Sequence, residues 1–316
     1  MSKKILITGG AGCLGSNLIE HLYSSGHVIC AIDNFATGKK EAIPEQDRLK
    51  VIEGSVADEI LVDDVFKDFQ PNYVIHSAAA YKDPMDWAED SRTNIIGSVN
   101  VAKAALENGV QRLINFQTAL CYGRPTSIPI PIEHPTQPFT SYGISKTAGE
   151  AYFMNSELPT ISLRLANICG PRLAIGPIPT FYKRLKEGQG CFCSESVRDF
   201  LDMSDFINLI DLALEENAPL GLFNVSTGVG NSIHDVFCEV CNYLELEIPE
   251  VPISPIGSDD IAEVVLDPSE TEVAFNWRAK FDFKSTIQNQ LQWYDRFGIN
   301  DIFSHLALPP KANNRS

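Results

Sequence analysis

The sequence Lys4-Ile5-Leu6-Ile7-Thr8-Gly9-Gly10-Ala11-Gly12-Cys13-Leu14-Gly15 places a short β-branched run directly before a cluster of glycines. An amphipathic helix is predicted to follow, from about Ser16 to Ser25. The glycines at 9, 12 and 15 let the turn bend, let backbone N–H groups approach a ligand and let helix and strand pack closely. The start of the helix adds unpaired N–H groups and a partial positive charge. Strand, turn and helix together predict a binding site for a pyrophosphate.

A second apolar run, residues 28–32, is predicted to be a buried strand that ends at Asp33. An acid about 20 residues after the glycines holds the adenosine ribose in dinucleotide-binding folds. The same carboxylate repels the 2′-phosphate of NADP, and Asn34 rather than an arginine follows it. We therefore expect NAD as the cofactor, and we interpret Lys39 and Lys40 as part of a solvated loop.

The composition limits the partners of the chain. Its 316 residues carry a net charge of −16, which disfavours nucleic acid and anionic membranes because both need a basic face. The apolar run after Lys4 is too short for a signal peptide, and no stretch is long enough to span a bilayer. These features predict a cytoplasmic protein without a nucleic-acid or membrane partner.

The eight cysteines are expected to be reduced thiols. Cys191 and Cys193 form a CxC, Cys238 and Cys241 form a CxxC, and His234 is the only histidine nearby. Zinc needs paired clusters or histidines at ligand spacing, and the CxxC lies within a helical pattern rather than at a helix start. We interpret these cysteines as core residues and predict no metal site.

The first half of the chain alternates predicted strands and helices, which indicates a parallel sheet covered on both faces. The sequence therefore predicts an α/β fold, a Rossmann-type doubly wound parallel sheet with a smaller α/β C-terminal substrate domain. Residues 1–170 form the predicted NAD-binding domain and residues 171–316 the substrate domain. The chain is expected to return to the first domain around 200–230, so that the two are intertwined.

Several predicted elements matter for the site. A strand is expected over Arg112–Thr118, and helices over about Ser91–Asn108, Tyr142–Ser156 and Phe181–Glu187. Residues 123–140 contain five prolines and are predicted to be an irregular loop. Because long loops in compact domains commonly bind ligands, we interpret this loop as part of a substrate site. The last residues, 309–316, are expected to be a frayed tail.

Two tyrosines are followed by lysine four residues later, Tyr142 with Lys146 and Tyr182 with Lys186. Residues four apart share a helix face, so each pair could act together. Tyr182 lies in a run of charged residues and is interpreted as part of a solvated face. Tyr142 opens a helix just after the proline-rich loop and is the preferred candidate. An ammonium and the cationic nicotinamide ring are expected to lower the pKa of the Tyr142 phenol by about 3 units, which makes it a base for alcohol oxidation.

Thr118 is expected at the carboxyl edge of the sheet, where open α/β sheets bind ligands, although a strand-end hydroxyl is also common without function. With these motifs in order, the chain resembles the extended short-chain dehydrogenases, and within them the NAD-dependent nucleotide-sugar epimerase/dehydratase family of the UDP-glucose 4-epimerase type. The resemblance runs through about Trp277. It rests on these segments: residues 8–15, 33–34, 76–79, Asn94 with Gly97 and Asn100, 118–123, Tyr142 with Lys146, 164–171, 198–200, 223–225 and 266–269.

The resemblance implies roles for individual residues. Tyr142 would take the proton from the sugar 4-hydroxyl, Thr118 would hydrogen-bond that oxygen, and Lys146 would bind the nicotinamide ribose and lower the pKa of the tyrosine. The implied substrate-binding residues are Thr118, Asn167, Arg198 and Asp260, with Asn167 and Arg198 on the diphosphate. The implied cofactor-binding residues are Gly9, Gly12, Cys13, Leu14, Gly15, Asp33, Asn34, Ser55, Val56, Ser77, Ala78, Ala79, Asn94, Tyr142 and Lys146.

The chain also departs from the family pattern. Many 4,6-dehydratases carry Asp-Glu after the hydroxyl residue, but Ala119 and Leu120 stand there. Tyr81 replaces a lysine that epimerases often have near the cofactor, Ser55 replaces a common aspartate, and Gly257 replaces an arginine that often clamps a phosphate. The missing carboxylate favours epimerisation over dehydration.

Three functional hypotheses follow. The leading one is a cytoplasmic NAD-dependent UDP-hexose C4 epimerase that works through a transient 4-keto sugar, serving polysaccharide biosynthesis. The second is a 4,6-dehydratase, decarboxylase or reductase on the same fold. The third is a sensor of NAD or nucleotide sugar that has no catalytic activity. The resemblance also implies a homodimer formed through the helix near Ser91–Asn108 and the helix that carries Tyr142, with Ile95, Val99, Ala102 and Leu106 facing either the partner or the core.

Overall fold

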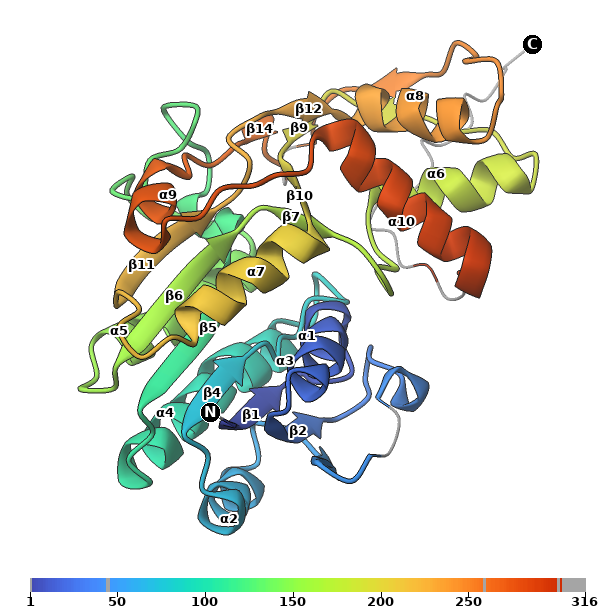
Figure 1. Ribbon diagram of the computed structural model, residues 1–316. Helices are drawn as coiled ribbons and strands as arrows, with labels where there is room; N and C mark the ends of the chain where they lie inside the picture. Colours follow the sequence, from blue (N-terminus) through green and yellow to red (C-terminus); the bar gives the residue numbers. More distant parts are fainter. Residues whose placement is uncertain (1, 44–45, 258–259, 300–301, 303–316) are drawn as a thin grey trace.

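The computed structural model describes residues 2–43, 46–257, 260–299 and 302. Its centre is a seven-stranded parallel sheet in the order β11-β6-β5-β4-β1-β2-β3 (Figure 1). β-Branched and aromatic residues fill these strands, as expected for strands that are covered on both faces. The strands are β1 (Lys4–Thr8), β2 (Val28–Asp33), β3 (Leu49–Glu53), β4 (Tyr73–His76), β5 (Arg112–Thr118), β6 (Thr160–Leu165) and β11 (Gly221–Val225). The predicted doubly wound parallel sheet is confirmed.

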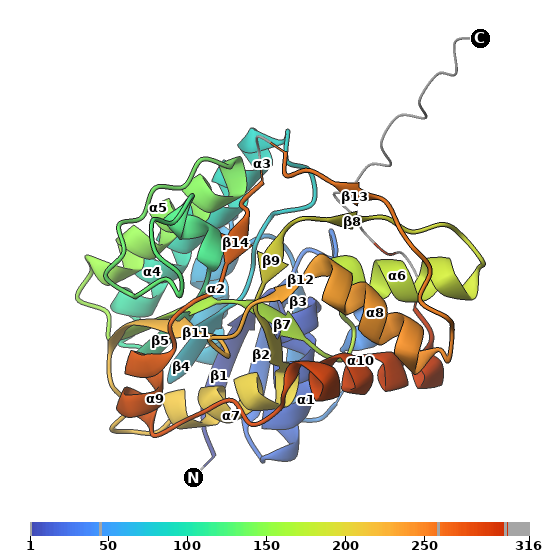
Figure 2. The ribbon, with the colours of Figure 1, turned by 90° about the horizontal axis from the view of Figure 1, so that it is seen from above.

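Two layers of helices cover the sheet, and Figure 2 shows them on opposite sides. Alternation along β1 explains both cores, because Ile5 and Ile7 point into one and Leu6 into the other. The first layer holds α1 (Cys13–Ser24) and α7 (Met203–Ala213). The second holds α2 (Glu59–Phe69), α4 (Gly97–Glu107) and α5 (Ser141–Met154).

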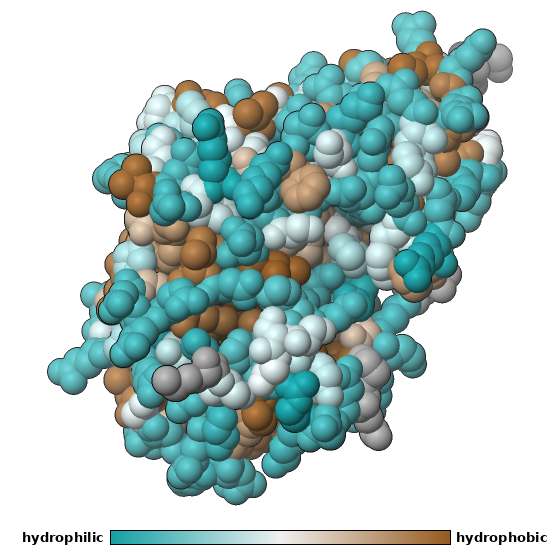
Figure 3. All heavy atoms as spheres, in the orientation of Figure 1, coloured by the Kyte–Doolittle hydropathy of each residue, from teal (hydrophilic) through white to brown (hydrophobic). Residues whose placement is uncertain are grey.

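The later part of the chain adds a smaller body, at the upper right in Figure 1. Its core lies among α6 (Pro177–Lys186), α8 (Ile233–Tyr243) and α10 (Phe283–Phe297). Small sheets, separate from the main one, belong to this part of the chain: β7 (Asn167–Cys169) with β10 (Phe200–Asp202), β9 (Val197–Arg198) with β12 (Asn231–Ser232) and β14 (Glu263–Val264), and β8 (Cys193–Ser194) with β13 (Ile253–Ser254). The helix α9 (Ser269–Phe275) packs back against β11. Hydrophilic residues cover most of the face seen in Figure 3.

The helix expected over 91–108 is divided into a π-helix and an α-helix, and a short helix precedes them. The short helix α3 (Trp87–Asp90) runs into a π-helix over Ser91–Ile96, and α4 begins only at Gly97. A π-turn contains one extra residue, which widens the helix locally and re-aims its side chains. A short 3-10 helix over Ala119–Tyr122 also follows β5 directly.

The basic helix begins earlier than predicted, at Pro177, because proline fits the first turn of a helix where no N–H partner is needed. The prediction of a solvated face for Tyr182 is wrong. Its ring is buried against Tyr294, and its hydroxyl donates to Asp295, which also accepts from Lys186. The spacing of tyrosine and lysine therefore ties α6 to α10 and has a structural use.

The proline-rich loop, residues 123–140, is fixed at its middle. Ile130 is buried, its N–H donates to the carbonyl of Val265, and its carbonyl accepts from the N–H of Asp267. The carbonyl of Ile130 also accepts from Asn224 of β11. These bonds make the middle of the loop a link between the sheet and the C-terminal segment. The tail at 309–316 lies outside the described residues.

Beneath α5, a buried ion pair joins Arg164 of β6 to Glu150, with 2.8 Å between guanidinium and carboxylate and side chains only 6% and 5% exposed. Ser162 donates to the same carboxylate, and Arg164 donates to the hydroxyl of Tyr122. The pair therefore joins the helix, the sheet and the segment after β5.

Replacement of Arg164 by methionine should leave the Glu150 carboxylate buried without its partner. We expect the free energy of unfolding to fall by about 3–5 kcal/mol, measured by urea denaturation. The double variant Glu150→Leu/Arg164→Met removes both charges and should lose less than the single variant. If the single variant has a free energy of unfolding equal to or higher than that of the double variant, the buried carboxylate does not need its partner and this account of the ion pair is wrong.

Candidate active site

The glycine turn between β1 and α1 is shaped by close approach of backbone segments. Gly9 has a φ of +67°, and a Cβ built on it would lie 2.7 Å from the amide nitrogen of Ala78. A Cβ on Gly15 would lie 2.2 Å from the carbonyl oxygen of Gly9. Gly12 caps α1 without any side-chain hydrogen bond to the first turn. The turn therefore leaves the N–H groups at the start of α1 available to an anion.

Asp33 lies at the end of β2 and is buried beside this turn. One carboxylate oxygen accepts from the N–H of Ala11 at 2.8 Å, and the other accepts from the N–H of Phe35 at 2.7 Å. Each oxygen keeps a further lone pair for a ribose hydroxyl. The carboxylate thus fixes the glycine turn and is placed to recognise the adenosine ribose, which fits a bound NAD.

The segment after β4 packs against the glycine turn and the end of β1. Ser77 donates its N–H to the carbonyl of Thr8, and the N–H of Ala78 donates to the hydroxyl of Thr8. Asn94 is buried; it donates to the carbonyl of Ala80 at 3.0 Å and to the hydroxyl of Ser145 at 2.9 Å. Because its amide is bonded to Ala80 and Ser145, Asn94 fixes the segment after β4 relative to α5.

The remaining predicted cofactor residues surround the same edge of the sheet. Cys13 directs its thiol to the carbonyl of Pro171, and burial raises the pKa of that thiol to about 12, so it is a neutral packing group. Ser55 accepts from the N–H of Ala57, and Val56 is buried with its carbonyl bound by Asn100. Leu14, Asn34 and Ala79 remain partly or fully accessible to a ligand.

Thr118, Tyr142 and Lys146 come from two elements that pack directly together. Thr118 ends β5, and its hydroxyl accepts from the N–H of Leu120 at 3.2 Å. Thr140 caps α5, which places Tyr142 in its first turn. A Cβ on Gly143 would lie 3.0 Å from the carbonyl oxygen of Leu120, so only glycine allows this approach without displacement.

Gln117 is a functional residue that sequence reasoning missed. Its side-chain carbonyl accepts from the N–H of Thr118 at 2.7 Å, and its amide donates to the carbonyl of Lys146 at 3.0 Å. The buried amide therefore fixes the backbone of two predicted catalytic residues relative to each other. The available signal was a glutamine directly before the predicted catalytic Thr118 at the end of a strand.

The electrostatics of the pair differ from expectation. Burial lowers the pKa of Lys146 to about 8, with Glu150 opposing the shift. Burial raises the pKa of Tyr142, and the charges of Tyr81 and Asp90 raise it further. The predicted lowering is therefore not a property of the protein alone, because desolvation of the phenolate outweighs any attraction to the lysine. Tyr81 contacts the Tyr142 ring edge-on, with centroids 6.3 Å apart.

The predicted substrate residues lie on the short strands next to this edge. Asn167 is exposed at the start of β7 and donates to the carbonyl of Asp199. Arg198 of β9 forms an ion pair with Asp260 at 2.7 Å, and Ser196 also donates to Asp260. The carboxylate of Asp260 therefore orients Arg198 and does not itself suit a phosphate, which it would repel.

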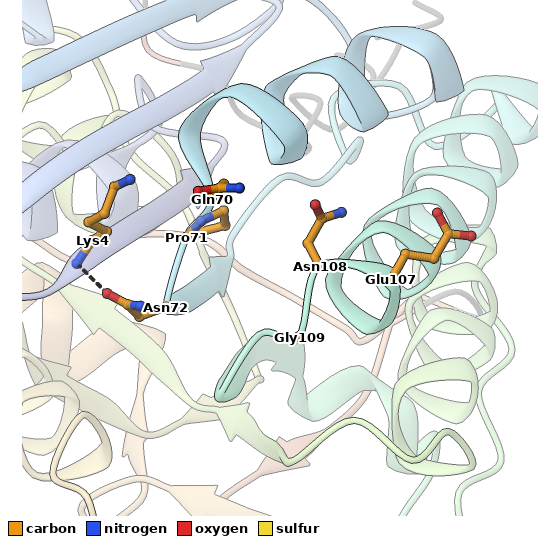
Figure 4. A pocket seen from close by; sticks show the side chains of 7 residues that line it. All are labelled: Lys4, Gln70, Pro71, Asn72, Glu107, Asn108 and Gly109. Carbon is orange, nitrogen blue, oxygen red and sulfur yellow. Dashed lines mark hydrogen bonds between the residues drawn. The ribbon is translucent and has the colours of Figure 1, made fainter.

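A hollow of about 580 Å³ opens at the opposite, amino-terminal edge of the sheet (Figure 4). Its lining is polar, and Lys4 and Glu107 lie on opposite sides of it. Because ligands of open α/β sheets bind at the carboxyl ends of the strands, this hollow is not the active site. No group of three or more metal-ligating side chains occurs among the described residues. None of the described helices is long and apolar enough to cross a membrane.

The sheet, the glycine turn and the Tyr142 and Lys146 pair define an enzyme of the extended short-chain dehydrogenase class. The chain belongs to the NAD-dependent epimerase/dehydratase family, whose sequence profile matches residues 5–226. NAD is its cofactor.

Three solved or curated proteins illustrate the similarity. The chain is 64% identical to the Bordetella bronchiseptica enzyme WbmG, crystallised with NAD and with NAD and UDP, with a TM-score of 0.93 over 97% of this chain and 98% of that one. It is 29% identical to a Thermus thermophilus UDP-glucose 4-epimerase in complex with NAD, with a TM-score of 0.84 over 92% and 99% of the chains. A UDP-glucose 4-epimerase of Halalkalibacterium halodurans is 28% identical over 92% of this chain and 95% of its own length.

Replacement of Asp33 by asparagine should weaken NAD binding by about tenfold or more, because charge-assisted hydrogen bonds to hydroxyls are worth about 1.5–3 kcal/mol. Affinity for NADP should fall less, since the repulsion of the 2′-phosphate is removed as well. Isothermal titration calorimetry measures both. Asp64→Asn, the same change on the exposed face of α2, is the control. Equal losses for NAD and NADP would contradict the role of Asp33.

Proposed function

We propose that, among the nucleotide-sugar-modifying enzymes of its family, this protein is an NAD-dependent C4 epimerase of a UDP-hexose that works through a transient 4-keto sugar. The observation that carries the proposal is the packing of α5, with Tyr142 and Lys146, against β5, which ends at Thr118. Gln117 joins the backbones of Thr118 and Lys146. The crystallisation of WbmG with NAD and UDP supports a UDP-linked substrate. The predicted place in cytoplasmic polysaccharide synthesis belongs to the same proposal.

The residues divide the chemistry as follows. The Tyr142 oxygen takes the proton of the sugar 4-hydroxyl and later returns it, while Thr118 donates to the reacting oxygen and keeps it in place. NAD, when bound, supplies the hydride acceptor and donor for C4. Lys146 binds the nicotinamide ribose, and its buried ammonium favours the ionised tyrosine. α5 approaches the carbonyl of Leu120 closely at Gly143, so Tyr142 and Lys146 are carried by a helix that packs tightly against the segment after Thr118.

The diphosphate is assigned to Arg198 and Asn167. Arginine suits a diphosphate because its planar guanidinium matches two phosphate oxygens. Burial lowers the pKa of Arg198 and Asp260 opposes that shift, so the ion pair helps keep the charge beside the cleft. The 4-keto sugar can then rotate to present its other face while the diphosphate stays bound.

The side chains after Thr118 favour epimerisation over dehydration. Ala119 is buried and Leu120 packs against the small core around Tyr122. Neither can donate or accept the proton that loss of water requires. A dehydratase, decarboxylase or reductase on this fold is the alternative reaction class, and a sensor without catalytic activity is the third reading of the chain.

Purified protein with NAD and a panel of UDP-hexoses, followed by NMR, tests the proposal. We expect a sugar inverted at C4 with no net NADH, and Tyr142→Phe should lower the rate by about 10²-fold or more while NAD still binds. Tyr182→Phe is the matched control, because its hydroxyl binds Asp295 in the smaller body. A keto sugar, a decarboxylated sugar or stoichiometric NADH would replace the epimerase with the second reaction class.

The predicted homodimer uses α4 and α5, which pack side by side. Ala102 is in the core, whereas Ile96, Leu106, Ile144 and Tyr152 are 43–53% exposed. Exposed apolar side chains on two adjacent helices fit a second copy of the same surface. We propose that this surface forms the dimer.

Analytical ultracentrifugation should find a dimer at micromolar concentration. Leu106→Glu should shift it to the monomer, because a carboxylate would be buried in the interface. Val273→Glu, on the strongly exposed surface of α9, should leave the dimer intact. A monomeric native protein would contradict the proposal.

A further inference from the structure

Two hydrogen bonds join the end of α3 and the π-helix to the first turn of α5. The hydroxyl of Ser141 donates to the Asp90 carboxylate at 2.6 Å, and Asn94 donates to the hydroxyl of Ser145 at 2.9 Å. The donors and acceptors are four residues apart on both sides, so the bonds lie one above the other. We call this pair of bonds the Asp90/Asn94 ladder. Tyr142 lies in the helical turn between its two serines.

The ladder also reaches the other side of the Tyr142 ring. Asn94 holds Ala80 through two hydrogen bonds, one from the N–H of Ala80 and one to its carbonyl. The next residue, Tyr81, places its ring against that of Tyr142. Asn94 of the π-helix thus bonds to the residue before Tyr81 and to a serine on the turn that carries Tyr142.

Asp90 brings a buried acid to this region. It is 2% exposed, and burial raises the pKa of its carboxyl while the bond from Ser141 lowers it. Three further acids of the same segment, Asp83, Asp86 and Glu89, raise the pKa as well. Its carboxylate is held by Ser141, the residue directly before Tyr142. A negative charge near a phenol disfavours the phenolate, because two like charges repel each other in a low dielectric.

The groups that face Tyr142 come from three elements. The segment after β4 contributes Tyr81, the end of α3 contributes Asp90, and α5 itself contributes Lys146 one turn further on. The 3-10 helix after Thr118 packs against α5, and its residues Ala119–Tyr122 include no carboxylate, ammonium or guanidinium. Among the carboxylates of the described residues, Asp90 is the one whose charge raises the pKa of Tyr142 and so opposes ionisation of this phenol.

We propose that Asp90 is a positioning residue that fixes the start of α5 through Ser141 and, by its negative charge, biases Tyr142 toward the neutral phenol. The inference rests on the proposed role of Tyr142 as the base. A phenolate formed against this charge is more basic, so each ionised site accepts the sugar proton more readily. Asp90 would thereby set the pH range in which the enzyme works.

Asp90→Asn tests the inference because the amide oxygen still accepts from Ser141 while the charge is removed. We expect Tyr142 to ionise at a pH lower by about half a unit to one unit in the variant. The readout is the ultraviolet absorbance of tyrosinate in the NAD-loaded protein during an alkaline titration. Subtracting the same titration of Tyr142→Phe, made in each background, isolates the one phenol.

The acid limb of kcat/KM should move to lower pH by the same amount, because a phenol of lower pKa stays ionised at a lower pH. Glu89→Gln is the matched control, since it removes a like charge from a more exposed side chain of α3 and should move the titration by less than about 0.2 unit. Ser141→Ala should lower kcat while Tyr142 ionises at nearly the wild-type pH.

If Asp90→Asn does not fold, Asp90→Ser removes the charge with a smaller polar group and must show the same downward shift. An unchanged or upward-shifted titration in the folded variant would overturn the inference. Because the absorbance titration needs no substrate, a shift without any turnover would leave the role of Asp90 standing and contradict the proposed reaction instead. Turnover without a shift in the Tyr142 titration would contradict the role of Asp90 and leave the proposed reaction standing.

Discussion

The buried ion pair between Arg164 and Glu150 is the constraint on which the active site depends. Arg164 lies on β6, the second strand from one edge of the sheet, and donates to the carboxylate of Glu150, the hydroxyl of Tyr122 and the carbonyl of Ile132. Burying two charges costs several kcal/mol each before their attraction and hydrogen bonds offset it. The fold accepts this cost because the pair joins the helix that carries Tyr142 to the strand next to Thr118.

From this pair the connections continue into the second half of the chain. Tyr122 donates to Asn224 of β11, and Asn224 donates to the carbonyl of Ile130 in the proline-rich loop. Ile130 then pairs with the segment around Val265 and Asp267. Residues from both halves of the sequence are thus fixed to one polar network, so their relative positions do not depend on side-chain packing alone.

Much of this arrangement can be predicted from the sequence, because its signals are local. The strand, glycine turn and helix at the N-terminus follow from residue types with strong backbone preferences, and Asp33 follows from spacing along one βαβ unit. The Tyr142 and Lys146 pair was separable from Tyr182 and Lys186 by context. The prediction for Tyr182 itself was wrong, because its burial depends on Asp295 and Tyr294, more than 100 residues away.

The features that sequence reasoning missed share one cause, which is that they arise from contacts between distant segments. Gln117 and Asp90 act through hydrogen bonds to backbone or serine groups that any fold could place elsewhere. Asn94 was predicted from the sequence, but its hydrogen bonds to Ala80 and Ser145 were not. The raised pKa of Tyr142 likewise comes from burial and from neighbours on other elements. Residue pattern identifies a candidate base, but its protonation depends on tertiary structure.

The central claim is that C4 of the sugar is inverted without exchange of its hydrogen. The most direct measurement uses a UDP-hexose that carries deuterium at C4, with NMR and mass analysis of the product. The account predicts a C4-inverted sugar that retains deuterium at C4, because the hydrogen leaves and returns to the same carbon within one closed site. Deuterium found at C6, or lost to water, would contradict it.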